Sequence, residues 1–438
     1  MKKRSRLFFF LVGLFTATDI YVAGYVSITE FFMILASPFV LLRNLPRLRH
    51  DGFGTTLCLL LLTLGGCVLA CFLNHSPMGS FIRGFFTIYS MFAIVICLHA
   101  LLRNQFDGLK WILLGNCFSM VLNIFIFQQG ATHGAQGSTA FISADAMAET
   151  LEYSLFWVSR VKAFLYVPIT GWYESIPKIY SIPVVIAVAV MGLFYSGGSG
   201  RSVAVCAIAT CALLFVGAKS RRGLLFLRRN MIWILVGMAV LMAGFKVTYE
   251  KLAINGYLGE QAYKKYQAQT KSGTGVVSLL MGGRVEFFAG VYACLQKPIV
   301  GYGPWALDTD NIFGGFLAKY GTLEDYEQNE AFVRARLETG RAALIPAHSH
   351  IICFWLWYGI FGFLFWAYVF FIMVNVFFKW ISSYPAWYGY LACGLPSYIW
   401  GILFSPFGGR VMSMLLIVVC LLIRAQATGR IQMLPRHY

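Results

Sequence analysis

Apolar stretches, each about long enough to cross a lipid bilayer, recur along almost the whole 438-residue chain. A membrane-spanning helix needs roughly 20 mostly apolar residues, and it must satisfy all its backbone hydrogen bonds internally because the bilayer core holds no water. Hydrophobic residues make up 59% of the sequence and charged residues only 12%, with a mean hydropathy of +0.69. This exceeds what a soluble core of this size needs. The sequence therefore predicts an all-α polytopic integral membrane protein.

Eleven of these stretches are clear and a twelfth is weaker. The clear ones lie near residues 7–24, 27–42, 54–73, 81–101, 109–127, 179–197, 202–218, 230–247, 351–378, 387–404 and 411–423. The weaker one, near 147–168, contains Arg160 and Lys162. Counting it gives about twelve transmembrane helices with both termini in the cytoplasm, and the basic segment 219–229 then also lies in the cytoplasm. Omitting it puts this segment on the side of the membrane opposite the basic N-terminus.

The charge distribution favours twelve helices. The formal net charge is +17, and on this topology most lysines and arginines of the short connections fall in the cytoplasm, as the positive-inside rule requires. Membrane lipids with anionic headgroups are then the partners of this charge, rather than nucleic acid. The basic N-terminus "MKKRSR" precedes a first helix that we expect to be retained, because a second apolar stretch follows at once.

The twelve-helix topology divides the chain into three parts. Residues 1–247 form an N-terminal bundle of about nine spans, residues 248–350 form a large extracytoplasmic loop between helices 9 and 10, and residues 351–438 hold the last spans and a cytoplasmic tail. The loop contains ten of the eighteen acidic residues, and loops of this length usually carry function. After Arg284 its apolar spacing predicts a helix on the membrane surface or over the spans, followed by a turn at 298–304.

Two histidines mark the point where the loop re-enters the bilayer. His348 and His350 are two positions apart, so they face different sides of a helix and do not form the i, i+4 pair typical of a metal site. One interpretation is a pair of ordinary interfacial histidines. The other is a general base or phosphate contact at the mouth of a membrane cavity, because histidine titrates near neutral pH.

Two arginines that follow glycines are the second candidate feature. Arg201 in "YSGGSGRSVAV" and Arg284 in "MGGRVEF" both fall on the extracytoplasmic side, where arginine is unfavourable for topology. The exposed backbone amides of glycines and the N-terminus of a helix both bind anions. The alternative is an ordinary arginine at the membrane surface, with its apolar stem buried and its charge in water. With a histidine on the same side, they predict a site for a phosphorylated ligand presented from the lipid.

Weaker candidates are left open. Tyr302 in "VGYGPW" could contact sugar or phosphate, or be an ordinary turn residue. The "DTD" sequence at 308–310 could hold a divalent metal, but Asp-x-Asp is short and common. Four further ionisable residues near membrane boundaries could line a cavity and cannot be ranked from sequence: Asp19, Glu30, Arg83 and Arg410.

Three segments together resemble the O-antigen ligase and polymerase superfamily. "GGRVEFFAGVYACLQKPIVGYGPWAL" is similar to its Gly-Arg, helix, Pro-x-x-Gly-x-Gly pattern, and "SGGSGRSVAVCAI" to its Ser-Arg element. "AHSHIICFWLWYGIFG" resembles its His-Asn motif followed by Gly-x-x-Gly, which aligns His348 as the motif histidine. Two positions depart from the pattern. Ser349 replaces the usual asparagine, so His350 could share or take the histidine's role, and a glycine separates Ser199 from Arg201.

The resemblance implies an inverting, metal-independent glycosyltransferase of the bacterial inner (cytoplasmic) membrane, with its active site facing the periplasm and no cofactor. It implies a donor glycan carried on polyprenyl diphosphate, usually undecaprenyl diphosphate, and an acceptor that is lipid A-core or another glycan. In this scheme Arg201 and Arg284 bind the diphosphate, His348 acts on the acceptor hydroxyl, and His350 and Tyr302 are second-tier candidates.

Four functions remain open at this point. An O-antigen ligase of lipopolysaccharide biosynthesis is placed first, narrowly ahead of a polysaccharide polymerase of the same superfamily. A protein O-oligosaccharyltransferase is a third version of the same chemistry. A transporter of lipid-linked glycans belongs to a different class, and it would predict charged residues deep within several spans. The sequence does not distinguish the acceptor, the sugar or the oligomeric state.

Overall fold

The computed structural model describes residues 3–125, 285–320, 344–376 and 385–431, apart from positions 17, 22–24, 309–310, 346, 406 and 408–409, together with isolated residues between 206 and 257. The expected spans near 147–168, 179–197, 202–218 and 230–247 lie wholly or mostly outside the described residues. Arg201 and Arg284 also lie outside them.

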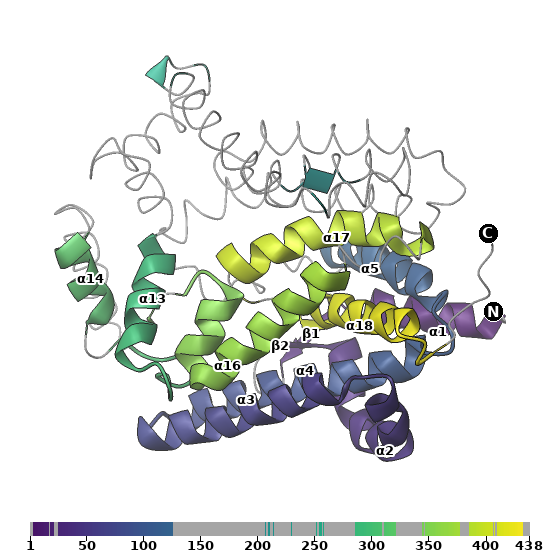
Figure 1. Cartoon of the computed structure of the whole chain (residues 1–438), viewed down its shortest axis with the longest axis horizontal. Coiled ribbons are helices and arrows are strands. Elements are labelled where there is room, and N and C mark those ends of the chain that lie inside the picture. The colour runs from purple at the N-terminus through teal and green to yellow at the C-terminus, as the bar shows by residue number, and fades with distance from the viewer. Residues whose placement is uncertain are drawn as a thin grey trace.

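The described part of the chain is almost entirely helical. Its helices are α1 (Lys3–Leu14), α2 (Ile28–His50), α3 (Gly54–Leu73), α4 (Met78–Leu102), α5 (Gly108–Phe125), α13 (Val285–Gln296), α14 (Ile312–Tyr320), α16 (His350–Asn375), α17 (Pro385–Phe404) and α18 (Arg410–Ala427). Helices α3 and α4 run side by side along the bundle, whereas α13 runs across their direction at one end (Figure 1).

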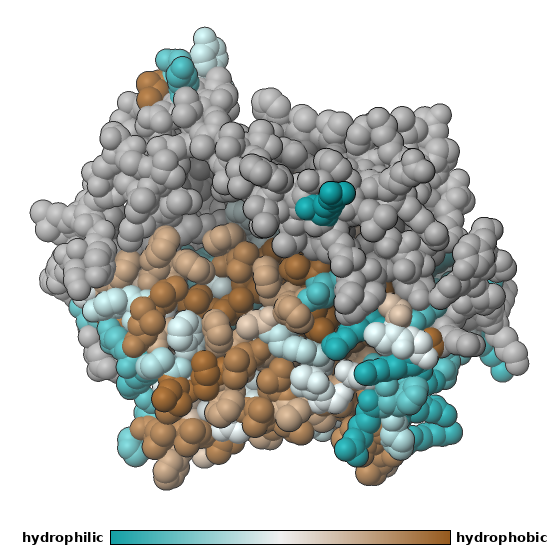
Figure 2. All heavy atoms as spheres, in the orientation of Figure 1, coloured by the Kyte–Doolittle hydropathy of each residue, from teal (hydrophilic) through white to brown (hydrophobic). Residues whose placement is uncertain are grey.

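Five of these helices, α2, α3, α4, α16 and α18, are long and apolar enough to cross a membrane. Large side chains on them are turned outward, such as Phe39 and Leu42 of α2, which are 77% and 80% exposed. Figure 2 shows a broad apolar surface over the described helices, with hydrophilic residues toward its two ends. An apolar surface of this extent requires lipid rather than water as solvent, and the chain is a helical membrane protein.

The expected first span, near 7–24, is wrong as a single helix. Helix α1 ends at Leu14, and its 12 residues extend only about 18 Å, short of a bilayer core of about 30 Å. A two-stranded antiparallel hairpin follows, pairing β1 (Asp19–Tyr21) with β2 (Tyr25–Ser27). Just beyond the end of α1 the Thr16 hydroxyl donates to the Gly13 carbonyl and accepts a hydrogen bond from Asn116 of α5.

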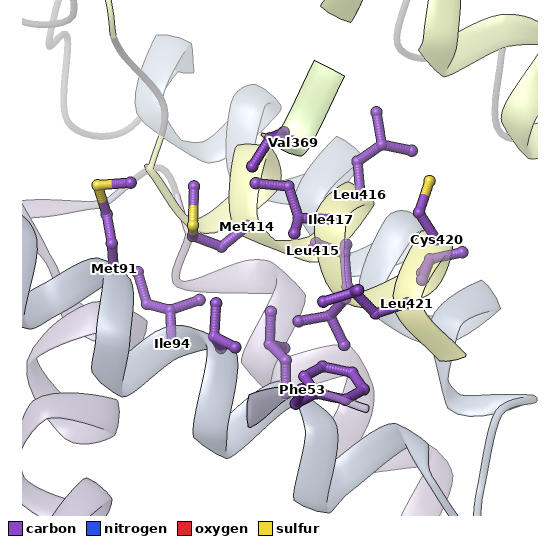
Figure 3. Packing of buried hydrophobic residues seen from close by; sticks show 14 of the residues in the cluster. Phe53, Met91, Ile94, Val369, Met414, Leu415, Leu416, Ile417, Cys420 and Leu421 are labelled. Carbon is purple, nitrogen blue, oxygen red and sulfur yellow. The ribbon is translucent and has the colours of Figure 1, made fainter. Parts of the chain in front are cut away.

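The centre of the bundle is the contact between α4, α18 and α16. Figure 3 shows Met91 and Ile94 of α4 facing Met414, Leu415 and neighbouring residues of α18. These side chains are almost completely buried. The α18 helix is buried around most of its circumference in this position, so it is an interior helix of the bundle.

Hydrogen bonds to the buried carboxylate of Asp51 join the turn between α2 and α3 to the end of α4. Oδ2 of Asp51 lies 2.8 Å from Nε2 of His99 and 2.5 Å from Nε of Arg103. Its Oδ1 lies 3.1 Å from Nδ1 of His50. Burial raises the pKa of the Asp51 carboxyl, but hydrogen bonds from Arg103, His50 and His99 outweigh it and hold the pKa below its ordinary value. We call this end of the bundle the Asp51 end.

Replacing Asp51 by asparagine is expected to destabilise the protein by roughly 1.5–3 kcal/mol at neutral pH, because the charge-assisted hydrogen bond from Arg103 to a buried carboxylate is lost. Since the folded pKa is lowered, this stabilisation is present above the ordinary aspartate pKa and disappears as pH falls through the folded value. Thermal unfolding in detergent measures it. Asp107→Asn, on an exposed aspartate beyond α4, is the control, and equal unfolding temperatures for the two variants would contradict the expectation.

The expected span 351–378 is also not a straight helix. Gly359 interrupts α16 with φ 65° and ψ −154°. The rings of His350 and Trp366 lie 4.9 Å apart although 16 residues separate them, a separation of about 24 Å in a straight helix. The two halves of α16 therefore form a V, and the first half packs against the second through Phe354 and Trp366, whose ring centroids are 5.4 Å apart.

Candidate functional site

The break in α16 is filled by a loop that comes from outside the spans. The docking loop, residues 297–304, follows α13 and lies against α16 and the turn between α3 and α4. The amide of Tyr302 donates to the Leu356 carbonyl at 2.6 Å, and the amide of Ile360 donates to the Ile299 carbonyl at 3.0 Å. These bonds satisfy backbone groups that the break would otherwise leave unpaired inside the membrane protein.

Glycine is required at both sides of this contact. A Cβ atom at Gly359 would lie 2.0 Å from the Ile299 carbonyl oxygen, and one at Gly301 would lie 2.6 Å from the Leu356 carbonyl oxygen. Both glycines have positive φ, a conformation that other residues rarely adopt. The Gly-x-x-Gly and Gly-x-Gly patterns of the sequence therefore build one structural feature, the seat of the docking loop in the broken helix.

The same loop reaches the turn between α3 and α4. The side-chain amide of Asn74 donates to the Gly301 carbonyl at 3.1 Å, and Lys297 donates to Asn74 at 2.8 Å. The indole nitrogen of Trp355 donates to the Pro298 carbonyl at 2.7 Å. We call this end of the bundle, opposite the Asp51 end along α4, the loop end.

Helix α13 and the start of α16 form one packed unit at the loop end. The amide of Ile345 donates to the Ala306 carbonyl at 3.0 Å. Leu307 pairs with Leu344 in an isolated antiparallel bridge. A buried apolar cluster connects the parts; it contains Ala293, Cys294, Tyr302, Ala306, Ile312, Ile345, Ile352 and Leu356. These contacts hold α13 beside the segment that carries the two histidines.

His348 lies against the first turn of α13, where its ring is in contact with the carboxylate of Glu286. The contact joins Nδ1 of His348 to Oε2 of Glu286, and the two side chains keep 19% and 26% of their surface exposed. A carboxylate at Nδ1 fixes the orientation of a histidine ring and favours a proton on that nitrogen. The other ring nitrogen, Nε2, is then the one suited to accept a proton from a ligand.

His350 has a different environment. It is 5% exposed, and its ring lies among Trp366, Tyr398 and Phe407 at centroid distances of 4.9, 6.0 and 5.2 Å. Ser349 caps α16 by accepting a hydrogen bond from the Ile352 amide. The structure thus separates the histidines into a partly exposed one paired with a carboxylate and a buried one packed among aromatic rings.

Tyr302 belongs to the docking loop and is 9% exposed. Its hydroxyl donates to the Gln296 side chain at 3.2 Å, and the ammonium of Lys297 lies 4.6 Å from its ring centre. Its amide holds the break of α16, as described above. These contacts describe a residue that shapes the docking loop.

Asp308, the first residue of the "DTD" sequence, caps helix α14. Its two carboxylate oxygens accept hydrogen bonds from the amides of Ile312 and Phe313 at 2.7 and 3.0 Å. Asp308 thus satisfies amides of the first turn of α14, as an N-cap residue does, although Asn311 directly precedes the helix. The described residues contain no cluster of three or more His, Cys, Asp or Glu side chains that could bind a metal ion.

Glu286 is a candidate that the sequence interpretation overlooked. An acidic residue in the first turn of a helix is already explained by the helix dipole, and 62 positions separate it from His348. Arg284 lies outside the described residues but stands two positions before Glu286 in the sequence. The only available signal was that Glu286 is the single charged residue of an otherwise apolar helix.

The described residues define a helical membrane protein with a carboxylate–histidine pair beside a broken helix at the loop end. No protein-family model matches the chain, and no curated protein matches its sequence. The site itself is therefore the basis for any statement about function.

Proposed function

We propose that the protein is a membrane-embedded inverting glycosyltransferase of the O-antigen ligase and polymerase type. It transfers a glycan from polyprenyl diphosphate to an acceptor hydroxyl, with lipid A-core as the first acceptor to test. The observation that carries the proposal is the contact between His348 and Glu286 at the loop end. The site would face the periplasm of a bacterial inner membrane.

In this proposal the pair acts as a general base with an orienting carboxylate. Glu286 holds Nδ1, so Nε2 of His348 accepts the proton of the acceptor hydroxyl as its oxygen attacks the anomeric carbon. The bond between that carbon and the diphosphate oxygen breaks, and its electrons leave with the polyprenyl diphosphate. A single displacement of this kind inverts the anomeric centre.

The leaving diphosphate needs positive charge that is present before reaction. Arg284 is the candidate closest in sequence, because it directly precedes α13, whose first turn contacts His348. Arg201 is the second. Guanidinium groups bind phosphate oxygens with charge-assisted hydrogen bonds, and fixed donors that meet developing charge are usually the largest catalytic contribution.

Arg284→Gln and Arg201→Gln are each expected to reduce carrier release by about 10²–10³-fold, the loss typical for one donor to a developing anion. The measurement uses purified protein in lipid with a polyprenyl-diphosphate oligosaccharide and candidate acceptors, and it records free polyprenyl diphosphate and product size. A single adduct on lipid A-core indicates a ligase, a lengthening ladder a polymerase, and a glycosylated peptide a protein glycosyltransferase. Arg43→Gln, an exposed arginine of α2, is the control. Undiminished turnover in both site variants would refute the diphosphate contact.

A transporter of lipid-linked glycans is the second candidate. It is favoured by a buried ion pair between Glu30 of α2 and Arg410 of α18, because charged residues inside a membrane bundle often mark a substrate pathway. Movement of the intact donor between leaflets, with no release of carrier for any acceptor, would decide for transport.

A further inference from the structure

The outward face of α2 carries a stripe of apolar side chains. Among the described helices α2 packs mainly against α4, and it lies at the edge of the described bundle (Figure 1). Phe32, Leu35, Phe39 and Leu42 follow one another at spacings of three and four positions, and each is more than half exposed. This spacing places them on one face of the helix. The stripe extends over about 15 Å, the scale of one leaflet of a bilayer core about 30 Å thick.

The same helix ends in basic residues at the Asp51 end. Its last turn contains Arg47, Arg49 and His50, all of them exposed, and Arg49 continues the spacing of the apolar stripe. Arg430, just beyond α18, is also exposed. A Cβ atom at Gly52 would lie 2.5 Å from Nη1 of Arg430, so this guanidinium rests on the turn that follows α2. Two segments far apart in the sequence thus bring positive charge to one place.

The protein does not neutralise this charge within the part of the chain that the structure describes. The ion pairs found at the Asp51 end all go to Asp51, which is buried and already pairs with Arg103. Arg49 and Arg430 contact no carboxylate of the described residues. Asp107, in the turn between α4 and α5, is the other described acid of this end. Like charges gathered in this way repel one another unless an anion binds between them.

The apolar stripe and the basic end together have the chemistry of a phospholipid. Acyl chains suit the stripe, and guanidinium groups bind phosphate oxygens with charge-assisted hydrogen bonds. A free phosphate would use the basic end alone, and a zwitterionic lipid would leave its positive charge uncompensated. A phospholipid with a net negative headgroup uses both parts.

We propose that α2 holds one anionic phospholipid, with its chains along the apolar stripe and its phosphate at Arg49 and Arg430. The proposal is independent of the proposed glycan transfer. It differs from the general attraction of a basic protein face to an anionic leaflet, which depends on the number of charges near the surface. A site depends on where the charges are.

A lipid titration of the wild-type protein is the first test. Native mass spectrometry of purified protein in detergent measures the affinity for the first phosphatidylglycerol bound, and for phosphatidylcholine with the same acyl chains. Each basic residue near an anionic headgroup contributes a factor of about five in affinity. With two arginines, phosphatidylglycerol is expected to bind about 25-fold more tightly. Equal affinities for the two lipids would overturn the proposal.

Two matched double variants separate a site from general charge attraction. Arg49→Gln with Arg430→Gln is expected to lose the 25-fold preference for phosphatidylglycerol and to bind phosphatidylcholine as wild type does. Arg4→Gln with Arg6→Gln is the control and should keep the preference. Both arginines of the control are exposed on α1, which begins at the Asp51 end, because a Cβ atom at Gly108 would lie 2.5 Å from the ring of Phe9.

The control thus removes the same charge from the same end of the bundle. Equal losses in the two double variants would contradict a site at α2. Unfolding temperatures in lipid-free detergent, expected to match wild type, verify that folded protein is compared.

A competition experiment tests whether the ligand is a lipid. Glycerol 3-phosphate carries the phosphate of the headgroup without acyl chains, so an equal concentration should displace little of the bound phosphatidylglycerol. Displacement of most of the lipid at equal concentration would show that the basic end binds a free anion and that the apolar stripe contributes nothing, which refutes the proposed site.

Discussion

His348→Ala is expected to reduce carrier release by about 10²–10⁴-fold, the contribution usual for a positioned general base. In the proposed mechanism the partly exposed ring beside Glu286 takes a proton from an acceptor at the loop end. The loss should fall on turnover, with donor affinity close to wild type, because His348 contacts the acceptor rather than the diphosphate. Release of carrier with purified donor and acceptor measures turnover, and binding of farnesyl diphosphate measures donor affinity.

Glu286→Gln distinguishes an orienting carboxylate from a simple ion pair. Glutamine fits the same space but no longer favours the proton on Nδ1, and loss of such a supporting partner typically costs 10–100-fold in function. We therefore expect an intermediate loss of turnover with an unchanged unfolding temperature. Turnover equal to wild type in both His348→Ala and Glu286→Gln would remove the basis of the proposed chemistry.

Two other histidines serve as comparisons in the same assay. His75→Asn changes an exposed histidine of the α3–α4 turn at the loop end; asparagine tolerates its positive φ. His350→Phe keeps an aromatic ring among Trp366, Tyr398 and Phe407. Both should retain most of the turnover. If His350→Phe abolishes it while His348→Ala does not, the buried histidine has the role that we assign to His348.

The positions of most described helices follow from the sequence, because a membrane imposes a length and a composition on each span. Helix α3 coincides with the expected stretch 54–73, and α17 and α18 differ from theirs by a few residues. The error at α1 lies next to a polar contact, since Thr16, beyond the end of α1, accepts a hydrogen bond from Asn116 of α5. An apolar count alone does not detect such a bond.

The break in α16 and the partner of His348 could not be predicted, because both depend on contacts between distant segments. Gly359 lies in one of the most apolar stretches of the chain, and its positive φ and the carbonyl of Ile299, 60 positions earlier, make a glycine necessary there. Glu286 and Glu30 are similar cases. Each is an isolated acid in an apolar helix, and its importance follows from a basic residue supplied by another helix.

Gly359→Ala is expected to destabilise the protein by at least about 3 kcal/mol, since the backbone conformation at this position is accessible almost only to glycine and the added carbon would meet the Ile299 carbonyl oxygen at 2.0 Å. Relief requires that the docking loop move away from the break. The amides of Tyr302 and Ile360 would then lose their partners, inside a protein where few replacements are available.

The same substitution should also abolish glycan transfer, because the docking loop connects α13 with the first half of α16 and so holds Glu286 beside His348. Unfolding in detergent and carrier release measure the two effects. Gly65→Ala in α3 is the matched control. A Cβ there meets no atom within 4 Å, and alanine favours a helix by about 0.5–1 kcal/mol over glycine, so stability should be equal or higher. A Gly359→Ala protein with wild-type stability and turnover would show that the break in α16 is not required, and that the Glu286–His348 pair is held by other contacts.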